Sequence, residues 1–171
     1  HDPNYVALAP ASYECWAEVE ADSGVKLVHE TGGLDLERIG TSGLKDLDHC
    51  SAALAEYGIE HELLSGTEVR YRWPQFNVDD SVRAIFQSRG GLVDASKANA
   101  AHQILARANG ATVVAESPVR RLTADGEGVR IETEGKTYLV DRAIVAAGAW
   151  TNSLLTSLGV EWPLTITQEQ V

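Results

Sequence analysis

Apolar side chains recur at the spacing of a helical face in several stretches of the chain. The first stretch follows Asp2-Pro3, a capping acid and a proline at the first helical position. Pro10 is expected to kink or split this helix. Ser65 and Glu68 form the sequence pattern of a capping box, which begins a shorter helix. The predicted helices are residues 2–22, 44–57, 66–72, 95–109 and 150–158.

Alternation of apolar and polar residues between turn-forming glycines predicts β-strands. Segments 25–30 and 34–37 flank Thr31-Gly32-Gly33, which predicts a hairpin-like turn between them. Residues 143–148 are continuously apolar, as in a strand buried in a parallel sheet. The other predicted strands are residues 59–64, 82–87 and 112–115, a meander at 118–124, 129–134 and 137–140 with turns at 125–128 and 135–136, and a last strand after Pro163.

This order of elements predicts a mixed α+β fold. A small lobe of helices and strands is expected over residues 25–89. A helix, a strand and the meander, leading into the buried strand, are expected over residues 90–150. Gly90 and Gly91 would form a tight backbone passage between these parts. A chain of 171 residues is long enough for one domain with a real core.

Composition excludes several classes of partner. The formal net charge of −11 argues against nucleic acid and against anionic membranes, which bind clustered Lys and Arg. The longest apolar stretch, residues 143–150, is too short to span a bilayer. The five histidines have no metal-ligand spacing. Cys15 and Cys50 fall near the apolar faces of predicted helices, so we expect two buried free thiols in a reducing, cytoplasmic compartment.

The meander followed by residues 141–150 resembles the end of the FAD-binding domain in the D-amino-acid oxidase superfamily. In that pattern an apolar strand enters a turn of small residues beside the flavin, where larger side chains would clash with the cofactor. The branch of sarcosine oxidases and N-methyl-amino-acid oxidases fits best. The matching motifs run in order along the chain: HDPNYVALAPASYECW at 1–16, ETGGL at 30–34, RWP at 72–74, GGLV at 90–93 and AGAWT at 147–151.

Parts of the family's site do not occur in this sequence. No glycine cluster has the Gly-x-Gly-x-x-Gly spacing that seats a pyrophosphate on a helix N-terminus. The resemblance puts that turn and the flavin-side arginines upstream of His1. It puts the oxygen-activating basic residues and the cysteine that attaches flavin downstream of Val171. The chain begins without Met, and its last alternating run stops without a turn. We therefore expect an internal fragment of a two-domain flavoenzyme, inactive by itself.

The resemblance also implies a division of the fragment. Residues 1–24 would be a helical segment, 25–89 a lobe of the substrate domain, 90–158 a partial FAD-binding domain, and 159–171 a strand leading back to the substrate domain. Five positions match cofactor contacts. Val119 matches the strand position whose backbone pairs with the adenine edge, and the others match the turn near the flavin and the residue after it: Ala146, Ala147, Gly148 and Trp150.

Each assignment has a plainer alternative. Val119 would otherwise be an ordinary strand residue, the small residues a buried strand end, and Trp150 an anchor for its helix. The aromatic cluster Tyr71, Trp73 and Phe76 either lines a substrate pocket or, as is commoner for such clusters, plugs the core. No residue is assigned as catalytic or metal-binding, and substrate-binding residues are not assigned.

The activity implied by the resemblance is oxidation of the C–N bond of a small amine or amino acid, such as an N-methyl amino acid. FAD would carry that chemistry and pass the electrons to oxygen or to another acceptor. One alternative is a non-catalytic domain that binds a small molecule or a protein, including a second copy through exposed sheet edges. Another is an FAD-dependent D-amino-acid or glycerol-phosphate-type dehydrogenase.

Overall fold

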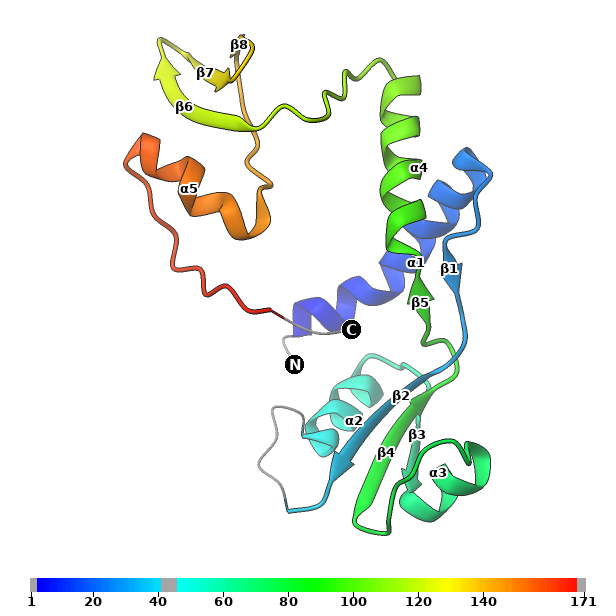
Figure 1. Ribbon diagram of the computed structural model, residues 1–171. Helices are drawn as coiled ribbons and strands as arrows, with labels where there is room; N and C mark the ends of the chain where they lie inside the picture. The colour runs from blue at the N-terminus through cyan, green and yellow to red at the C-terminus, as the bar shows by residue number, and fades with distance from the viewer. Residues whose placement is uncertain (1–2, 41–45, 169–171) are drawn as a thin grey trace. The chain divides into compact units, whose positions relative to one another are not determined.

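The computed structural model describes residues 3–40 and 46–168 of the chain. These residues divide into two compact units, 1–112 and 113–171, which are described in turn (Figure 1). All three sheets are antiparallel and are accompanied by helices, so the mixed α+β prediction is confirmed. In the described part of the chain, no helix has both the length and the apolar character needed to cross a membrane.

A three-stranded sheet forms the first layer of the first unit. Its strands are β2 (Gly33–Arg38), β4 (Val82–Gln87) and β3 (Glu62–Ser65), with β4 in the centre. Helix α3 (Gly66–Arg72) begins at the predicted capping box, where the Ser65 amide donates to Glu68 Oε2 at 2.7 Å and the Glu68 amide donates to Ser65 Oγ at 3.3 Å. The core between this sheet and α3 is made by Leu64, Val69 and Ala84, with Leu34, Trp73, Val78 and Phe86 packed around them.

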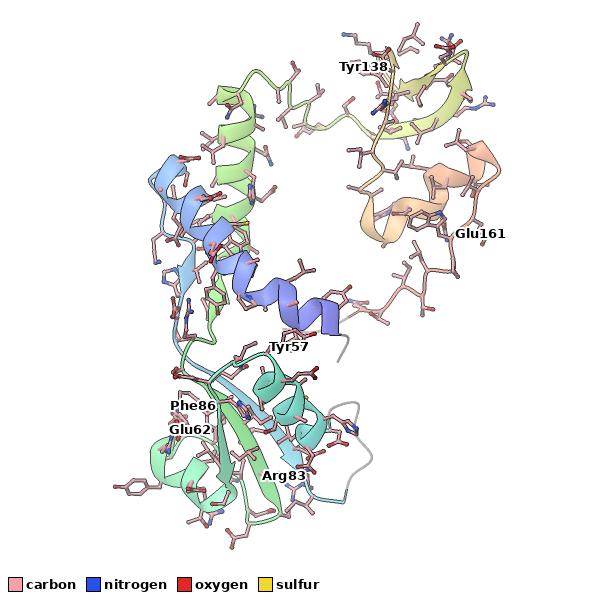
Figure 2. The ribbon with its side chains drawn as sticks, turned by 180° about the vertical axis from the view of Figure 1, so that it is seen from behind. Tyr57, Glu62, Arg83, Phe86, Tyr138 and Glu161 are labelled. Carbon is pink, nitrogen blue, oxygen red and sulfur yellow. The ribbon has the colours of Figure 1, made fainter. Side chains whose placement is uncertain are left out.

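Helix α2 (Leu47–Glu56) is joined to the same sheet by an ion-pair network. Arg83 of β4 donates through Nε to Glu37 of β2 and through a terminal nitrogen to Asp48 of α2, both at 2.7 Å (Figure 2). Because side chains alternate along a strand, Arg83 points away from its core neighbours Val82 and Ala84. One arginine thus links two strands and a helix.

The predicted hairpin around Gly32 and Gly33 is wrong. Strand β1 (Val28–His29) pairs with β5 (Leu92–Val93), whereas β2 pairs with β4. The segment that lies against Gly32 and Gly33 is Gly90-Gly91. The Gly32 amide donates to the Gly90 carbonyl at 2.9 Å, and a Cβ on Gly90 would lie 2.7 Å from the Cα of Gly33. The predicted tight passage at Gly90-Gly91 is therefore confirmed.

Two helices complete the first unit, α1 (Pro3–Ser23) and α4 (Ala95–Ala108). They pack around Leu27, Ala98 and Ala101, with Trp16 and Val19 of α1 against this cluster. Helix α1 continues through Pro10 without splitting. The predicted apolar face of α1 is buried only in its second half, since Tyr5 and Leu8 are 76% and 63% exposed.

The cysteine prediction is corrected in part. Neither Cys15 nor Cys50 forms a disulfide, but Cys15 is exposed and Cys50 is half-buried. Cys15 precedes Trp16 by one residue, which is about 100° around a helix, so its side chain lies off the buried face defined by Trp16 and Val19. An apolar helical pattern in the sequence does not show which neighbour the helix packs against. It therefore overestimates how much of the helix surface is buried.

The second unit contains the predicted meander of β6 (Val119–Asp125), β7 (Gly128–Thr133) and β8 (Thr137–Val140). A short helical region follows, made of a 3₁₀ turn at Gly148–Trp150, α5 (Thr151–Leu155) and a second 3₁₀ turn at Thr156–Leu158. This region is fastened to β6 through Ser157, whose Oγ donates to the Leu122 carbonyl at 2.7 Å and accepts from the Leu122 amide at 3.2 Å.

Three predicted strands do not form. Residues 112–115, 143–148 and the described part of the last segment, 164–168, have no strand pairing. The apolar run is not buried either: Ile144 is 95% exposed. A strand of a parallel sheet is held by neighbouring strands, and the described residues supply none beside this run. The sequence pattern therefore indicates a segment suited to a parallel sheet, but the described residues contain no strand that pairs with it.

Candidate functional site

The turn at 146–150 contains a glycine in the left-handed backbone region. Gly148 has φ +52°, a conformation that L side chains rarely adopt. A Cβ built there would meet nothing within 4 Å, so the space beside the turn is open. The turn is closed by the Trp150 amide, which donates to the Ala147 carbonyl at 3.0 Å, and by Thr151 Oγ1, which donates to the Gly148 carbonyl at 2.8 Å.

Val119 and Trp150 also belong to the second unit. Trp150 is 72% exposed, so the described residues leave most of its indole uncovered. Val119 is the first residue of β6, an edge strand of its sheet, and it pairs with Thr133 just before a register shift. Neither of the two pockets described below is lined by any of the five predicted residues.

The second unit exposes an unusual amount of apolar surface. Besides Trp150, Trp162 is 58% exposed and Ile144 is almost fully so. Surfaces of this kind normally pack against further chain or a partner. The exposed large apolar residues of this unit are Val114, Leu139, Ile144, Trp150, Leu158, Val160, Trp162, Leu164 and Ile166.

The first unit contains a cleft of about 790 Å³ between the first half of α1, the end of α2 and strand β4. This volume is in the range of small-molecule sites. We call it the tyrosine cleft, because Tyr5 and Tyr13 of α1 and Tyr57 at the end of α2 line it. Its other lining residues are Val6, Ala9, Pro10, Asp35, Cys50, Ala53, Leu54, Gly58, Ile59, Glu60, Ile85, Gln87, Ser88, Arg89 and Gly90.

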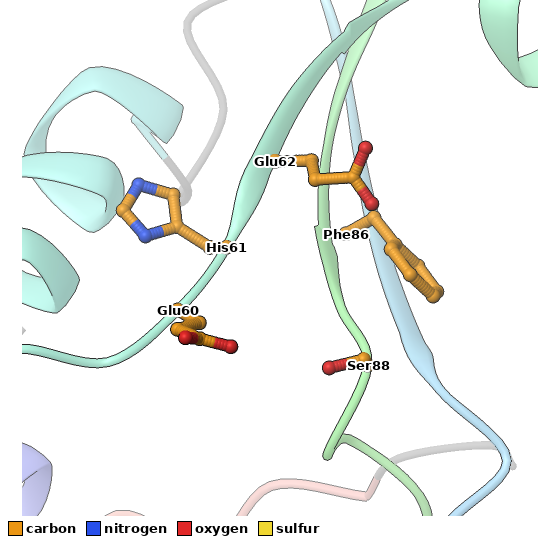
Figure 3. Close-up of a pocket in the computed structure, with 5 residues that line it drawn as sticks. All are labelled: Glu60, His61, Glu62, Phe86 and Ser88. Carbon is orange, nitrogen blue, oxygen red and sulfur yellow. The ribbon is translucent and has the colours of Figure 1, made fainter.

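A smaller pocket of about 340 Å³ lies on the same unit and is lined by Glu60, His61, Glu62, Phe86 and Ser88 (Figure 3). Glu60 and Ser88 also line the tyrosine cleft, so the two hollows share one rim. Glu62 is held by Arg72 through two hydrogen bonds of 3.0 and 2.7 Å, which keep the pKa of its carboxyl below the usual value.

Sequence reasoning missed the polar contact of His61. Its Nε2 lies 2.7 Å from Ser51 Oγ of α2, and its Nδ1 lies 3.0 Å from the Ile59 carbonyl. Because the carbonyl can only accept, Nδ1 carries the proton and Nε2 accepts from the serine. The pair ties α2 to β3, and nothing in the spacing of Ser51 and His61 along the chain predicts it. Among the described residues, no cluster of His, Cys, Asp and Glu could hold a metal ion.

The aromatic cluster near residue 73 is part of the core only at Trp73. Trp73 packs on Phe86 with ring centres 5.0 Å apart, as part of the core, which confirms the plug. Tyr71 is 88% exposed and lines neither pocket. Phe76 is 39% exposed and likewise lines neither of them.

Comparison with known proteins gives a family match over the whole sequence. The family model described as FAD-dependent oxidoreductase (DAO) matches residues 1–171. The monomeric sarcosine oxidase of Streptomyces avermitilis is 33% identical over 168 residues, and that of Bacillus sp. strain B-0618 is 33% identical over 160. These alignments cover 98% and 94% of this chain.

Among solved structures, the open form of a point mutant of NikD, an amino acid oxidase of nikkomycin biosynthesis, matches with a TM-score of 0.81. It is 27% identical, and the match covers 91% of this chain and 40% of that one. The chain spans only about two-fifths of the length of its relatives, 42% and 40% for the two sarcosine oxidases.

Proposed function

Because the chain belongs to the family of FAD-dependent oxidoreductases, we propose that it is part of an enzyme that oxidises the C–N bond of a small amine or amino acid, of the sarcosine-oxidase type. The observation that carries this proposal is the 33% identity to a monomeric sarcosine oxidase along 98% of the chain. The substrate class favoured by the matching motifs is an N-methyl amino acid. When bound, FAD would accept the electrons removed from the substrate.

The residues of the second unit fit one side of an FAD site. The small side chains of Ala146 and Ala147 and the open space at Gly148 would let a cofactor pass close to the backbone. The exposed Trp150 indole offers a ring surface to pack on it. Val119, on an edge strand, would offer its backbone amide and carbonyl to the adenine edge.

The same chain lacks the means to hold the rest of the cofactor. Its sequence has no glycine turn for the pyrophosphate. We therefore propose that residues 90–158 contribute only part of an FAD-binding domain and that residues 25–89 contribute part of a substrate domain. Residues 1–24 would be a helical segment and 159–171 a connecting strand. The exposed apolar surface of the second unit supports this, because it would be covered by the remainder of the flavoenzyme.

Two experiments test the proposal. First, the purified 171-residue chain is mixed with FAD and separated by gel filtration; we expect no flavin absorbance to remain with it. Second, a longer polypeptide that carries this chain within the full length of its relatives is purified and its spectrum recorded. It should retain flavin, and Gly148→Val should reduce the retained fraction, whereas Gly135→Val, at an open turn position, should not. A flavin-free full-length protein would contradict the proposal.

Activity assays on the same preparation identify the electron acceptor and the substrate. We expect oxygen consumption with sarcosine and other N-methyl amino acids. Turnover only with an artificial dye acceptor would instead favour the dehydrogenase alternative, and no turnover with any amine would favour a non-catalytic binding domain. A cytoplasmic location and self-association through sheet edges remain predictions, tested by cell fractionation and by sedimentation.

A further inference from the structure

Three features of the tyrosine cleft point to a ligand class that is separate from the flavin chemistry. Tyrosine rings line the cleft, carboxylates also line it, and a guanidinium already lies over one of the rings. Arg89 places its guanidinium carbon 5.0 Å from the centre of the Tyr13 ring. The chain itself therefore shows that an aromatic face in this cleft accepts a cation.

The other two rings are free to receive a second cation. Tyr5 is 76% exposed and Tyr57 39%, and neither side chain has a hydrogen bond or ring contact among the described residues. The hydrophobic part of the lining, including Leu54 and Ile85, would surround an apolar body. A weakly hydrated cation with apolar substituents loses little hydration on entering such a site, which is why aromatic lining favours it over a compact, strongly hydrated ion.

The charges around the cleft favour a cation over an anion. Among the described residues that line it, Arg89 is the one cation, and its guanidinium already lies over Tyr13 and 3.7 Å from the Glu30 carboxylate. Glu60 lines both hollows of this unit and has no ion-pair partner among the described residues. The net charge of −11 adds a long-range attraction for cations.

We propose that the tyrosine cleft binds an organic cation, a methylated ammonium or guanidinium group on a small apolar body, with Tyr5 and Tyr57 against its apolar face and Glu60 as counter-ion. This assignment uses none of the five cofactor positions and does not depend on the proposed oxidase activity. It therefore stands or falls on binding alone.

The test compares choline with 3,3-dimethylbutan-1-ol, which has the same shape without the charge. The 171-residue chain, labelled with ¹⁵N, is titrated with each compound and followed by amide chemical shifts. Choline should shift amides of the cleft, around Tyr5, Tyr57 and Glu60, and bind at least about tenfold more tightly than the neutral compound. Equal binding of the two compounds, or shifts scattered away from the cleft, would overturn the proposal.

Exposed variants with matched controls locate the site. Tyr5→Leu and Glu60→Gln should each weaken choline binding several-fold, about threefold to tenfold. Tyr71→Leu, on an equally exposed tyrosine of α3, and Glu56→Gln, on α2 outside the lining, should leave it unchanged. Since all four positions are exposed, folding is preserved and the shifts remain readable. Weakening by the controls to the same degree would contradict the assignment.

Discussion

Tyr13 and Arg89 hold each other by two contacts at once: the tyrosine hydroxyl donates to the arginine carbonyl, and the arginine guanidinium lies over the tyrosine ring. The pair joins the middle of α1 to the segment that follows β4. Both residues line the tyrosine cleft, and the pair fixes the first half of α1, which has little other packing.

The first prediction concerns the separate contributions of these two contacts to the free energy of unfolding. Tyr13→Phe removes only the hydrogen bond and should lower the free energy of unfolding by about 1 kcal/mol. Tyr13→Leu also removes the ring face and should cost about 0.5–1 kcal/mol more. Urea unfolding measures both. Tyr71→Phe, at an exposed tyrosine, should change stability by less than about 0.5 kcal/mol; an equal loss there would show that the effect is not specific to the pair.

The second prediction concerns the glycine crossing. A Cβ on Gly91 would lie 2.1 Å from the His29 carbonyl oxygen, so Gly91→Ala forces two backbone segments apart. We expect a loss of at least about 2 kcal/mol in the free energy of unfolding. Gly135→Ala is the control, since a Cβ there meets nothing within 4 Å, and it should be nearly neutral. A neutral Gly91→Ala would mean that the crossing is not as close as described.

Glu20 gives a third prediction, on pH. Its carboxylate accepts the amides of Val28 and Leu27 at 2.7 Å and pairs with Lys26 at 2.9 Å, which lowers its pKa to about 2. Because the pKa is lower in the folded state, this stabilisation is present above the unfolded value of 4.5 and is lost as the pH falls toward 2. Glu20→Gln should therefore be less stable than the wild type at pH 7.

The measurement for Glu20 is a difference between two proteins at several pH values. The stability gap between wild type and Glu20→Gln should narrow as the pH is lowered from 4.5 to about 2. Glu18→Gln, at an exposed position of the same helix, should show no gap at pH 7. A constant gap across the acid range would rule out ionisation of Glu20 as its cause.

A fourth prediction tests how the second unit is fastened. Ser157→Ala leaves the buried Leu122 without the hydroxyl that serves both its amide and its carbonyl. We expect a loss of about 1–3 kcal/mol and faster hydrogen exchange at the Leu122 amide. Ser153→Ala, on the exposed side of α5, should leave both unchanged. Unchanged exchange at Leu122 in Ser157→Ala would contradict the bond.

Local signals explain the parts of the fold that the sequence predicts well. The capping box of Ser65 and Glu68, the N-cap Asp94 and the turn at Asp125 act within a few residues, and all three occur in the structure. The interactions that decide them lie inside the window that the sequence pattern covers.

The failures concern partners that are distant in sequence. The close contact of Gly32 and Gly33 with Gly90 replaces the predicted hairpin, and no sequence pattern near Gly33 indicates it. The apolar run at 143–148 is predicted as a strand, but strand formation depends on neighbours that the described residues do not provide. The tyrosine cleft was also missed, since Tyr5, Tyr13 and Tyr57 come together only when α1 packs over the end of α2.

The crossing of Gly33 and Gly90 has a topological consequence. The chain enters the three-stranded lobe and leaves it at the same point, so the lobe is an insertion whose two ends already touch. Such an insertion can be removed and its ends joined by a short linker without stretching the strands β1 and β5 on the other side. Loops of the lobe can therefore vary in length and sequence while helices α1 and α4 keep their packing around Leu27.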